Sequence, residues 1–189
     1  MRALVAGFAV VVASGAIACA PARAPTFSRD ATLRTTDGGS LPLSVALHAH
    51  PLTVVTFFSA HCPCQRAHDA RLRQLMETYG PRNVGFLVVD SERTSTLARD
   101  AEEARLRSYP IVKDDDGKLA LSLDAEYATY SVILNTRGDI VYRGGFDSDK
   151  SHLRPSPTHY LADALDDALA GRPVQRPEAK TLGCTLEIR

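Results

Sequence analysis

The sequence predicts one α/β domain with a central mixed β-sheet flanked by helices, an N-terminal β-hairpin and an extended C-terminal tail. Two continuous apolar runs, residues 52–60 and 83–90, indicate strands buried on both faces, and a helical pattern follows each run. This alternation implies parallel strands joined by helices, and a later hairpin adds antiparallel strands. With 44% hydrophobic residues, the 189-residue chain can build one proper core.

The first half of the domain, expected to begin at residue 30, opens with a hairpin over residues 31–43 whose turn is the stretch DGG. The helix after the first apolar strand starts at Pro63, because proline suits the first helical position. Its apolar residues recur at helical spacing as far as Tyr79, and Gly80 is expected as its C-cap. A helix with a polar face follows the second strand, at residues 93–109.

The second half of the domain contains shorter elements and ends with a helix. We expect Ser156 or Thr158 to cap this last helix at its N-terminus and Gly171 to follow its end. The tail, residues 172–189, contains two prolines and no helical period, so it should lie extended across the surface. The predicted elements are a short strand at 110–114, a turn at 114–117, a short helix at 118–128, a hairpin at 131–146 and the last helix at 156–171.

The N-terminus predicts export. Residues 1–19 contain one arginine and an apolar run that is short for a membrane span and typical of a signal peptide. The stretch GAIAC resembles a bacterial lipobox, which implies lipidation at Cys19, with residues 20–29 as a tether; ordinary cleavage nearby is the alternative. The domain is therefore expected at the periplasmic or cell-surface face of a bacterial membrane, held there by the lipid anchor alone. Such a compartment tolerates disulfides.

The charge balance makes nucleic acid an unsuitable partner. Lysine plus arginine number 22, and aspartate plus glutamate also number 22, so the sequence implies no basic face.

The motif HCPCQRAH, residues 61–68, places two cysteines where a buried strand ends and a helix starts. Free N–H groups and the helix dipole favour a thiolate there, and the thiolate is the attacking species in disulfide exchange. Cys62, before the helix and expected to be the better exposed, is the predicted attacking thiol. A disulfide between Cys62 and Cys64 closes a small, strained ring, so Cys184 from the tail is an alternative partner.

Several stretches together resemble the redoxin branch of the thioredoxin-like superfamily, which includes the alkyl hydroperoxide reductase/thiol-specific antioxidant type. They are FFSAHCPCQRAH, VGFLVVDSE and VILNTRGDIVYRGGFD, and the resemblance covers residues 27–170. The tail, with Gly183 and Cys184 near its end, resembles an extension found in some bacterial redoxins, which also ends in a Gly-Cys pair. The resemblance implies thiol–disulfide exchange with protein or small-molecule thiols and no cofactor. Cys62 then attacks, Cys64 or alternatively Cys184 resolves, and His61 stabilises the thiolate.

The sequence also departs from the patterns of this superfamily. One residue, not two, separates the motif cysteines, and no proline stands near Thr129 and Tyr130, where thioredoxins have a cis-proline. Ser59 matches the hydroxyl position of peroxiredoxins, but Val55 replaces their proline and Thr129 their arginine. Without that arginine a peroxide lacks its main electrostatic partner, so a peroxidase is a weaker hypothesis than an exchange enzyme.

Two further hypotheses remain open. Cys62 and Cys64, with His61 or His68, could supply soft ligands for Cu(I) or Zn(II) in a chaperone-like module. The domain could also be an inactive surface lipoprotein.

Other polar residues of this region are expected to have no chemical role. His68, outside the metal hypothesis, is interpreted as a helix-surface histidine, and Arg66 and Asp69 as solvated charges. Asp90, at the end of the second strand, could accept a proton, but a turn residue is the preferred interpretation.

Overall fold

The computed structural model describes residues 29–188. The expected signal peptide with Cys19 lies outside the described residues, as does the expected tether apart from Arg29. Among the described helices, none has the length and apolar character needed to span a membrane.

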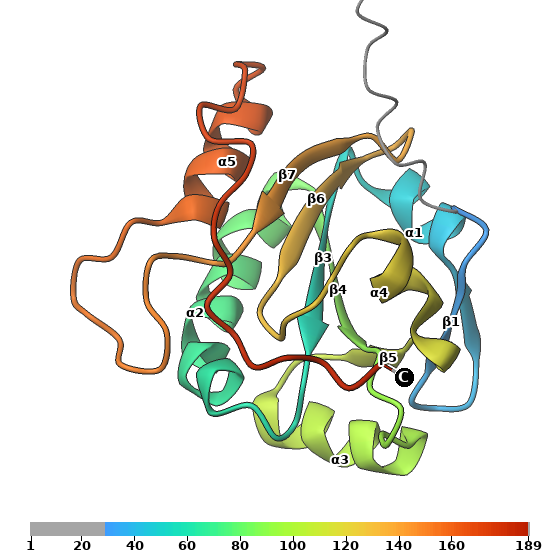
Figure 1. Ribbon diagram of the computed structural model, residues 1–189. Coiled ribbons are helices and arrows are strands. Elements are labelled where there is room, and N and C mark those ends of the chain that lie inside the picture. Colours follow the sequence, from blue (N-terminus) through green and yellow to red (C-terminus); the bar gives the residue numbers. More distant parts are fainter. Residues whose placement is uncertain (1–28, 189) are drawn as a thin grey trace, which may run out of the picture.

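A mixed sheet of seven strands forms the centre of the described domain, in the order β2-β1-β5-β4-β3-β6-β7 (Figure 1). β3, β4 and β5 run parallel, whereas the β1–β2 and β6–β7 hairpins join the sheet in antiparallel fashion. The predicted mixed sheet and both hairpins are therefore confirmed. The strands are β1 Thr32–Thr35, β2 Ser40–Pro42, β3 Leu52–Phe58, β4 Val84–Asp90, β5 Ile111–Lys113, β6 Ser131–Asn135 and β7 Ile140–Gly144.

Five α-helices surround the sheet within residues 29–188. The predicted helix at the cysteine motif is confirmed from Pro63 to Tyr79, but Gly80 ends it in a right-handed conformation and opens a short 3₁₀ turn. The helix after the hairpin, α1, was not predicted from the sequence. The helices are α1 Leu43–Ala49, α2 Pro63–Tyr79, α3 Leu97–Arg107, α4 Lys118–Ser122 and α5 Tyr160–Leu169.

Three helices are shorter than predicted. α3 begins only after Thr96, whose hydroxyl accepts a hydrogen bond from the N–H of Arg99. α4 ends at Ser122, so the segment before β6 is free of helix. α5 begins after His159; neither expected residue caps it, because both backbone groups of Thr158 bind Ser148.

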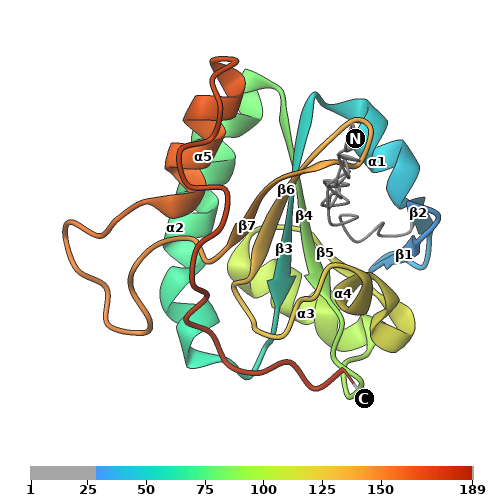
Figure 2. The same cartoon turned by 45° about the horizontal axis from the view of Figure 1, so that its top comes forward.

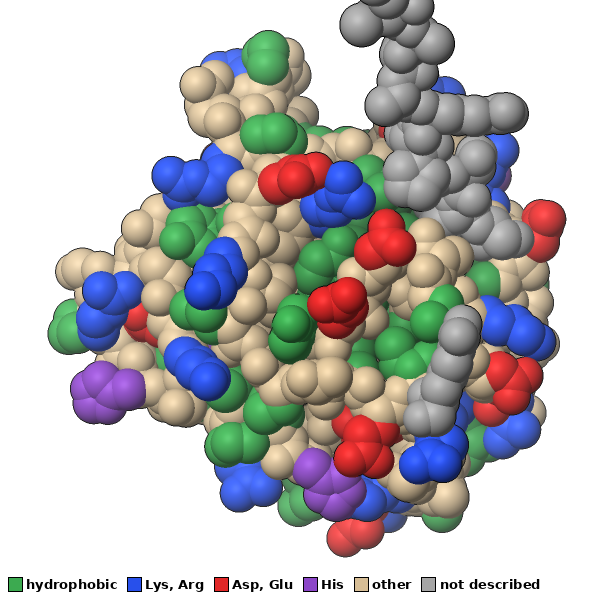
Figure 3. Space-filling model, viewed as in Figure 1, with side chains coloured by type: hydrophobic (Ala, Val, Ile, Leu, Met, Phe, Trp, Pro, Cys, Tyr) green, Lys and Arg blue, Asp and Glu red, His purple; other side chains and the backbone are tan. Residues whose placement is uncertain are grey.

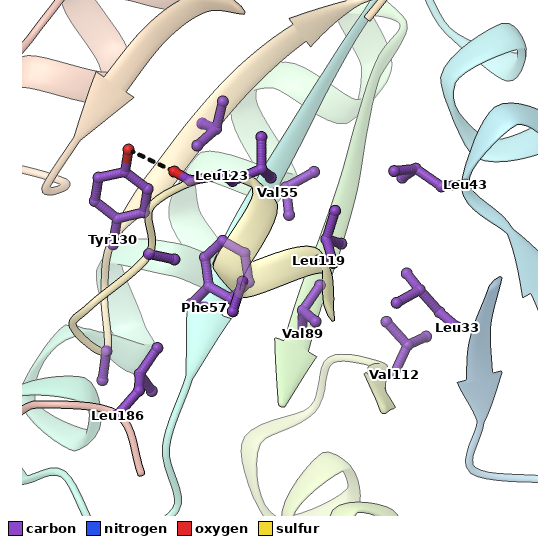
Figure 4. Close-up of a cluster of buried hydrophobic side chains, with 14 of the residues drawn as sticks. Leu33, Leu43, Val55, Phe57, Val89, Val112, Leu119, Leu123, Tyr130 and Leu186 are labelled. Atoms are coloured by element: carbon purple, nitrogen blue, oxygen red, sulfur yellow. Dashed lines mark hydrogen bonds between the residues drawn. The ribbon is translucent and has the colours of Figure 1, made fainter. Parts of the chain in front are cut away.

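Alternating side chains of β3 enter two separate cores, as the pleat of a strand requires. Val54 and Phe58 pack on the face covered by α2 and α5. Val55 and Phe57 pack on the other face, beneath α1, α4 and the tail, where Figure 4 shows them together with Leu186 (Figures 2 and 4). Every residue of β3 is buried, as its apolar run predicts.

The tail is extended, as predicted, and forms two isolated backbone bridges, one with β7 and one with the segment before β6. Its first contact is a parallel bridge between Glu178 and Arg143 of β7, and its second is an antiparallel bridge between Thr185 and Tyr127. Between them it passes the carboxyl end of β3 (Figure 1). Basic side chains gather on this side of the molecule, over α5 and the tail (Figure 3).

Candidate functional site

Cys62 is the N-cap residue of α2, at the point where β3 has ended. Its backbone is extended, Pro63 opens the helix, and the N–H of Gln65 donates to the Cys62 sulfur over 3.4 Å. An unpaired N–H of the first helical turn thus stabilises negative charge on this sulfur. The predicted placement of the motif is confirmed.

The sulfur atoms of Cys62, Cys64 and Cys184 all lie within 4.8 Å of one another, and all three thiols are free. The tail brings Cys184 to the motif across more than half of the sequence. Cys62 is only 1% exposed and Cys64 2%. The expectation that Cys62 is the better exposed of the two motif cysteines is therefore wrong, because both are buried and the tail lies over Cys62.

The thiol cluster, Cys62, Cys64 and Cys184, favours one negative charge rather than several. Burial raises the pKa of Cys64, and a charge on Cys62 raises it further, while Lys150 opposes the shift. Burial also raises the pKa of Cys184, to about 12, with the same contribution from Cys62. Negative charge at the position of Cys62 thus disfavours ionisation of Cys64 and of Cys184.

A pocket of about 480 Å³ opens beside the thiol cluster. His61, Glu92 and Arg99 line it together with Cys62 and Cys184. His61 is exposed, and its Nδ1 lies 3.4 Å from the guanidinium of Arg99. Because Arg99 can only donate, this contact requires a ring nitrogen that carries no proton. Arg99 is therefore the fixed positive charge of the pocket.

Asp90, Glu92 and Asp100 form an acidic cluster at the carboxyl end of β4, beside this pocket. Burial raises the pKa of Glu92, despite a hydrogen bond from Ser59, and Asp90 adds to the rise. Burial and Asp90 likewise raise the pKa of Asp100, to about 7. Asp90 ends β4 and accepts the N–H of Glu92, two residues further on, so it is the strand-end turn residue preferred from the sequence, although it is also buried.

Glu92 and Arg99 are pocket residues that the sequence did not single out. Glu92 stands two residues after a buried strand, at the same sheet edge as Cys62. That position could have identified Glu92 from the sequence. Residues that follow adjacent parallel strands lie at the same edge of the sheet.

His68 belongs to a different arrangement and is not on the surface, since it is 2% exposed. Its Nδ1 lies 2.8 Å from the carbonyl oxygen of Cys64, and its Nε2 lies 3.2 Å from Asp147. Burial alone would lower the pKa of His68, but Asp147 and this carbonyl raise it on balance. With both ring nitrogens occupied, His68 is not available as a metal ligand.

The bonds of His68 extend into an ion-pair network formed by His68, Arg71, Asp147, Asp149 and Arg154. Arg71 binds Asp147 over 2.5 Å and Asp149 over 3.1 Å, and Arg154 binds Asp149 over 2.6 Å. Burial raises the pKa of Asp147 and of Asp149, but the hydrogen bonds and charges of these partners lower it more. The pKa of Asp147 is lowered on balance, and that of Asp149 falls to about 2. The network fastens the loop between β7 and α5 to α2.

Asp69, expected in solvent, is also buried. It accepts hydrogen bonds from the Arg107 guanidinium and from the Tyr109 hydroxyl, the latter over 2.7 Å. Arg66 is exposed, as expected.

Thr129 occupies the place where the resemblance implies a cis-proline. The described residues contain no cis peptide bond, and Thr129 has a φ of 69°, a strained value for a β-branched residue. Its N–H donates to the carbonyl oxygen of Phe57 over 2.8 Å. This backbone contact fixes the loop before β6 next to the end of β3.

The parallel strands, the helix start and the three thiols define a thioredoxin-like fold with a thiol-based redox site. The chain belongs to the Redoxin family, whose family model matches residues 20–155.

Solved structures with the same fold come from several bacteria. An uncharacterized conserved protein from Geobacillus kaustophilus is 24% identical, with a TM-score of 0.73 over 86% of this chain and 92% of that one. A hypothetical protein from Sinorhizobium meliloti is 22% identical, with a TM-score of 0.73 over 87% and 96% of the two chains. A secreted disulfide oxidoreductase of Mycobacterium tuberculosis is 16% identical, with a TM-score of 0.50 over 59% and 80%. No curated protein matches the chain.

Proposed function

We propose that the protein is an exported thiol–disulfide oxidoreductase in which Cys62 attacks the disulfide of a protein or a small molecule. The observation that carries the proposal is the thiol cluster, with three sulfurs within 4.8 Å and a helix N–H directed at the sulfur of Cys62. A mixed disulfide forms first. A second thiol of the cluster then attacks the Cys62 sulfur and releases the client thiolate.

Both remaining cysteines can perform this second step. Cys64 lies in the first turn of α2, so its bond with Cys62 closes the small ring that the sequence predicts. Cys184 lies on an extended segment and can approach Cys62 without that restriction. We therefore propose Cys184 as an equal candidate, and not only as a substitute for Cys64.

The resolving thiol must lose a proton, because its pKa is raised whether it is Cys64 or Cys184. Glu92 lines the same pocket as Cys62 and Cys184 and has a raised pKa of its own. We assign it the role of proton acceptor. Arg99 supplies the positive side of the pocket, and His61 accepts from it.

Export with lipidation at Cys19 is part of the proposal and rests on the sequence of residues 1–19. Fractionation of cells that produce the full chain tests it. The native chain should enter the membrane fraction, whereas a Cys19→Ser chain should not. A native chain that stays in the cytosol would contradict export.

The proposed reaction is tested by peptide mapping of the alkylated protein after mild oxidation, with and without reductant. A reversible link from Cys62 to Cys64 or to Cys184 is expected, and its identity names the resolving thiol. Cys62→Ser should lower the rate of disulfide reduction by about 100-fold or more. A full rate in Cys62→Ser would exclude Cys62 as the attacking thiol.

The second candidate is metal binding, now by the thiol cluster and without His68. Three soft sulfur ligands suit Cu(I) or Zn(II). If all three thiols stay free under mild oxidant while copper or zinc co-purifies, this candidate replaces the first.

A further inference from the structure

The end of the tail closes the access of Cys62 to solvent and does so as an added strand. The N–H of Ala128 donates to the carbonyl oxygen of Cys184 over 2.8 Å, and the N–H of Leu186 donates to that of Glu126 over 2.9 Å. Between them, Thr185 forms an antiparallel bridge with Tyr127. These bonds use backbone groups alone, so any extended peptide of suitable shape can form them.

Two side chains at the end of the tail point inward and determine where the tail end lies on the domain. Leu186 is buried and joins the core beside Phe57 (Figure 4). Cys184 directs its sulfur to those of Cys62 and Cys64. The intervening Thr185 is exposed. The alternation of inward and outward side chains is that of a strand lying over the thiols.

Gly183 is required by close packing. A Cβ atom at this position would lie 1.8 Å from the carbonyl oxygen of Ala128, far inside a normal contact. The residue immediately before the cysteine therefore has no room for a side chain in this arrangement. The shape of the site thus specifies glycine.

The tail end can leave without unfolding the rest of the tail. An anchor, Pro177–Ala179, is held by two backbone hydrogen bonds of 3.0 Å with Arg143 and by the Glu178–Arg143 ion pair. The segment from Lys180 to Gly183, exposed to half-buried, connects this anchor to the end. Detachment of residues 183–188 requires only the loss of their own contacts.

We propose that residues 183–186 occupy the place of a client peptide and must leave before Cys62 can react with one. The client is then an extended segment with glycine immediately before its disulfide-bonded cysteine and an apolar residue two positions after it. This inference rests on the proposed function. It adds the class of substrate and says that the tail end controls the access of a substrate to Cys62.

The chemical step balances with the thiols already present. Cys62 thiolate attacks the client cysteine sulfur, the client disulfide breaks, and its other sulfur leaves as a thiolate. While the client holds the place of the tail end, Cys64 on α2 is the thiol that remains beside Cys62, so this arrangement favours Cys64 over Cys184 as the resolving thiol. The Cys64 thiolate attacks the Cys62 sulfur and releases the client thiolate. Two electrons pass from the protein to the client, which leaves one disulfide in the protein.

The first experiment measures iodoacetamide labelling of Cys62 in the full, reduced chain by peptide mapping. Gly183→Ala should detach the tail end and raise the labelling rate by about tenfold, the effect of about 1.4 kcal/mol. Leu186→Ala, which removes a buried contact without a clash, should act in the same direction. Gly80→Ala is the matched control, since nothing lies within 4 Å of its added Cβ. An unchanged rate in both tail variants would overturn the role of the tail as a cover.

The second experiment uses the peptide TLGCTL, copied from residues 181–186, as a mixed disulfide with 5-thio-2-nitrobenzoate. Its attack by Cys62 releases the coloured thiolate. Leu186→Ala protein should react about tenfold faster with this peptide than with TLACTL, while native protein should be slow with both. Equal rates for the two peptides would refute the glycine requirement.

Oxidised glutathione separates failure of this inference from failure of the proposed function. If the tail variants reduce glutathione disulfide but show no preference between peptides, only the inference is wrong. If reduced Cys62 attacks none of the three disulfides, the proposed function itself is wrong.

Discussion

Two groups of buried carboxylates flank the thiols, and their pKa values move in opposite directions. In the ion-pair network, Arg71 and Arg154 lower the pKa of Asp147 and that of Asp149. In the acidic cluster, burial and mutual repulsion raise the pKa of Glu92 and Asp100. The one lysine near this cluster, among the described residues, is Lys113, 3.8 Å from Asp90.

The difference shows that counter-charge, more than burial, decides what a buried carboxylate can do. A carboxylate paired with arginine stays ionised and fastens a loop. A carboxylate with too little positive charge exchanges its proton nearer neutral pH and is useful beside a thiol. The motif HCPCQRAH joins both environments, because its first residues face the pocket and His68 faces the network.

The largest expected effect comes from breaking the network. Asp147→Ala leaves His68 and Arg71 without their shared partner, and should lower the free energy of unfolding by about 3–5 kcal/mol. Urea denaturation measures it. The pKa of Asp147 is lowered, so its contribution is complete above about pH 4 and is lost as pH falls further.

Asp115→Ala is the control for this variant, because it removes a half-exposed ion pair with Arg34. Its cost should stay below about 1 kcal/mol. Similar costs for the two variants would mean that the network is not a structural clamp.

The next effect concerns the acidic cluster. Glu92→Gln removes the proposed proton acceptor and should slow single-turnover disulfide reduction by about tenfold or more. In native protein the rate should rise with pH through an inflection above the usual glutamate range, because the Glu92 pKa is raised. The variant should lack this inflection.

Glu187→Gln is the matched control, since Glu187 lines the same pocket but is exposed. It should leave the rate and its pH profile unchanged. If the two variants behave alike, Glu92 has no special role.

A smaller effect is expected at Asp100, and its sign is opposite to that at Asp147. Its pKa of about 7 means that the native state binds this proton more strongly than the unfolded state does. The stability that the group provides is complete below about pH 4 and is lost as pH rises to about 7. Asp100→Asn should therefore be more stable than native protein at pH 8, by about 1 kcal/mol.

Denaturation curves between pH 4.5 and 8.5 test this prediction. The advantage of Asp100→Asn should grow toward pH 7 and stay constant above it. An advantage that is independent of pH would show that Asp100 is not protonated in the native protein.

The smallest effect is expected at His61. Because Arg99 supplies the fixed charge, His61→Gln should slow disulfide reduction by about threefold at most, and Arg99→Gln should slow it more. Single-turnover rates of the two variants decide the order. The reverse order would restore His61 as the principal positive group, as the sequence suggested.

The sequence predicted those parts of the molecule that local rules determine. Alternating apolar runs located β3 and β4, and Pro63 located the start of α2, so the placement of Cys62 as N-cap followed from neighbouring residues. The hairpins followed from their turn residues. α1 was not predicted, because it is only seven residues long and follows directly on β2.

The parts that could not be predicted depend on contacts between distant segments. The burial of Cys62 comes from the tail, and that of His68 from a loop 79 residues further along the chain. Asp69 was predicted to be a solvated charge, because its own stretch of sequence gives no sign that Arg107 and Tyr109 donate hydrogen bonds to it. A polar residue on a helix reveals its partner only when the tertiary packing is known.

The anchor of the tail has a consequence for solubility. β7 is the last strand of the sheet, and its outer side would otherwise offer free backbone groups to another molecule. Pro177 and Ala179 occupy the N–H and carbonyl groups of Arg143, and a proline cannot extend the pairing. A protein cleaved before residue 177 would therefore expose β7 as an edge strand with unpaired backbone groups. We expect this protein to self-associate even when its thiols are blocked.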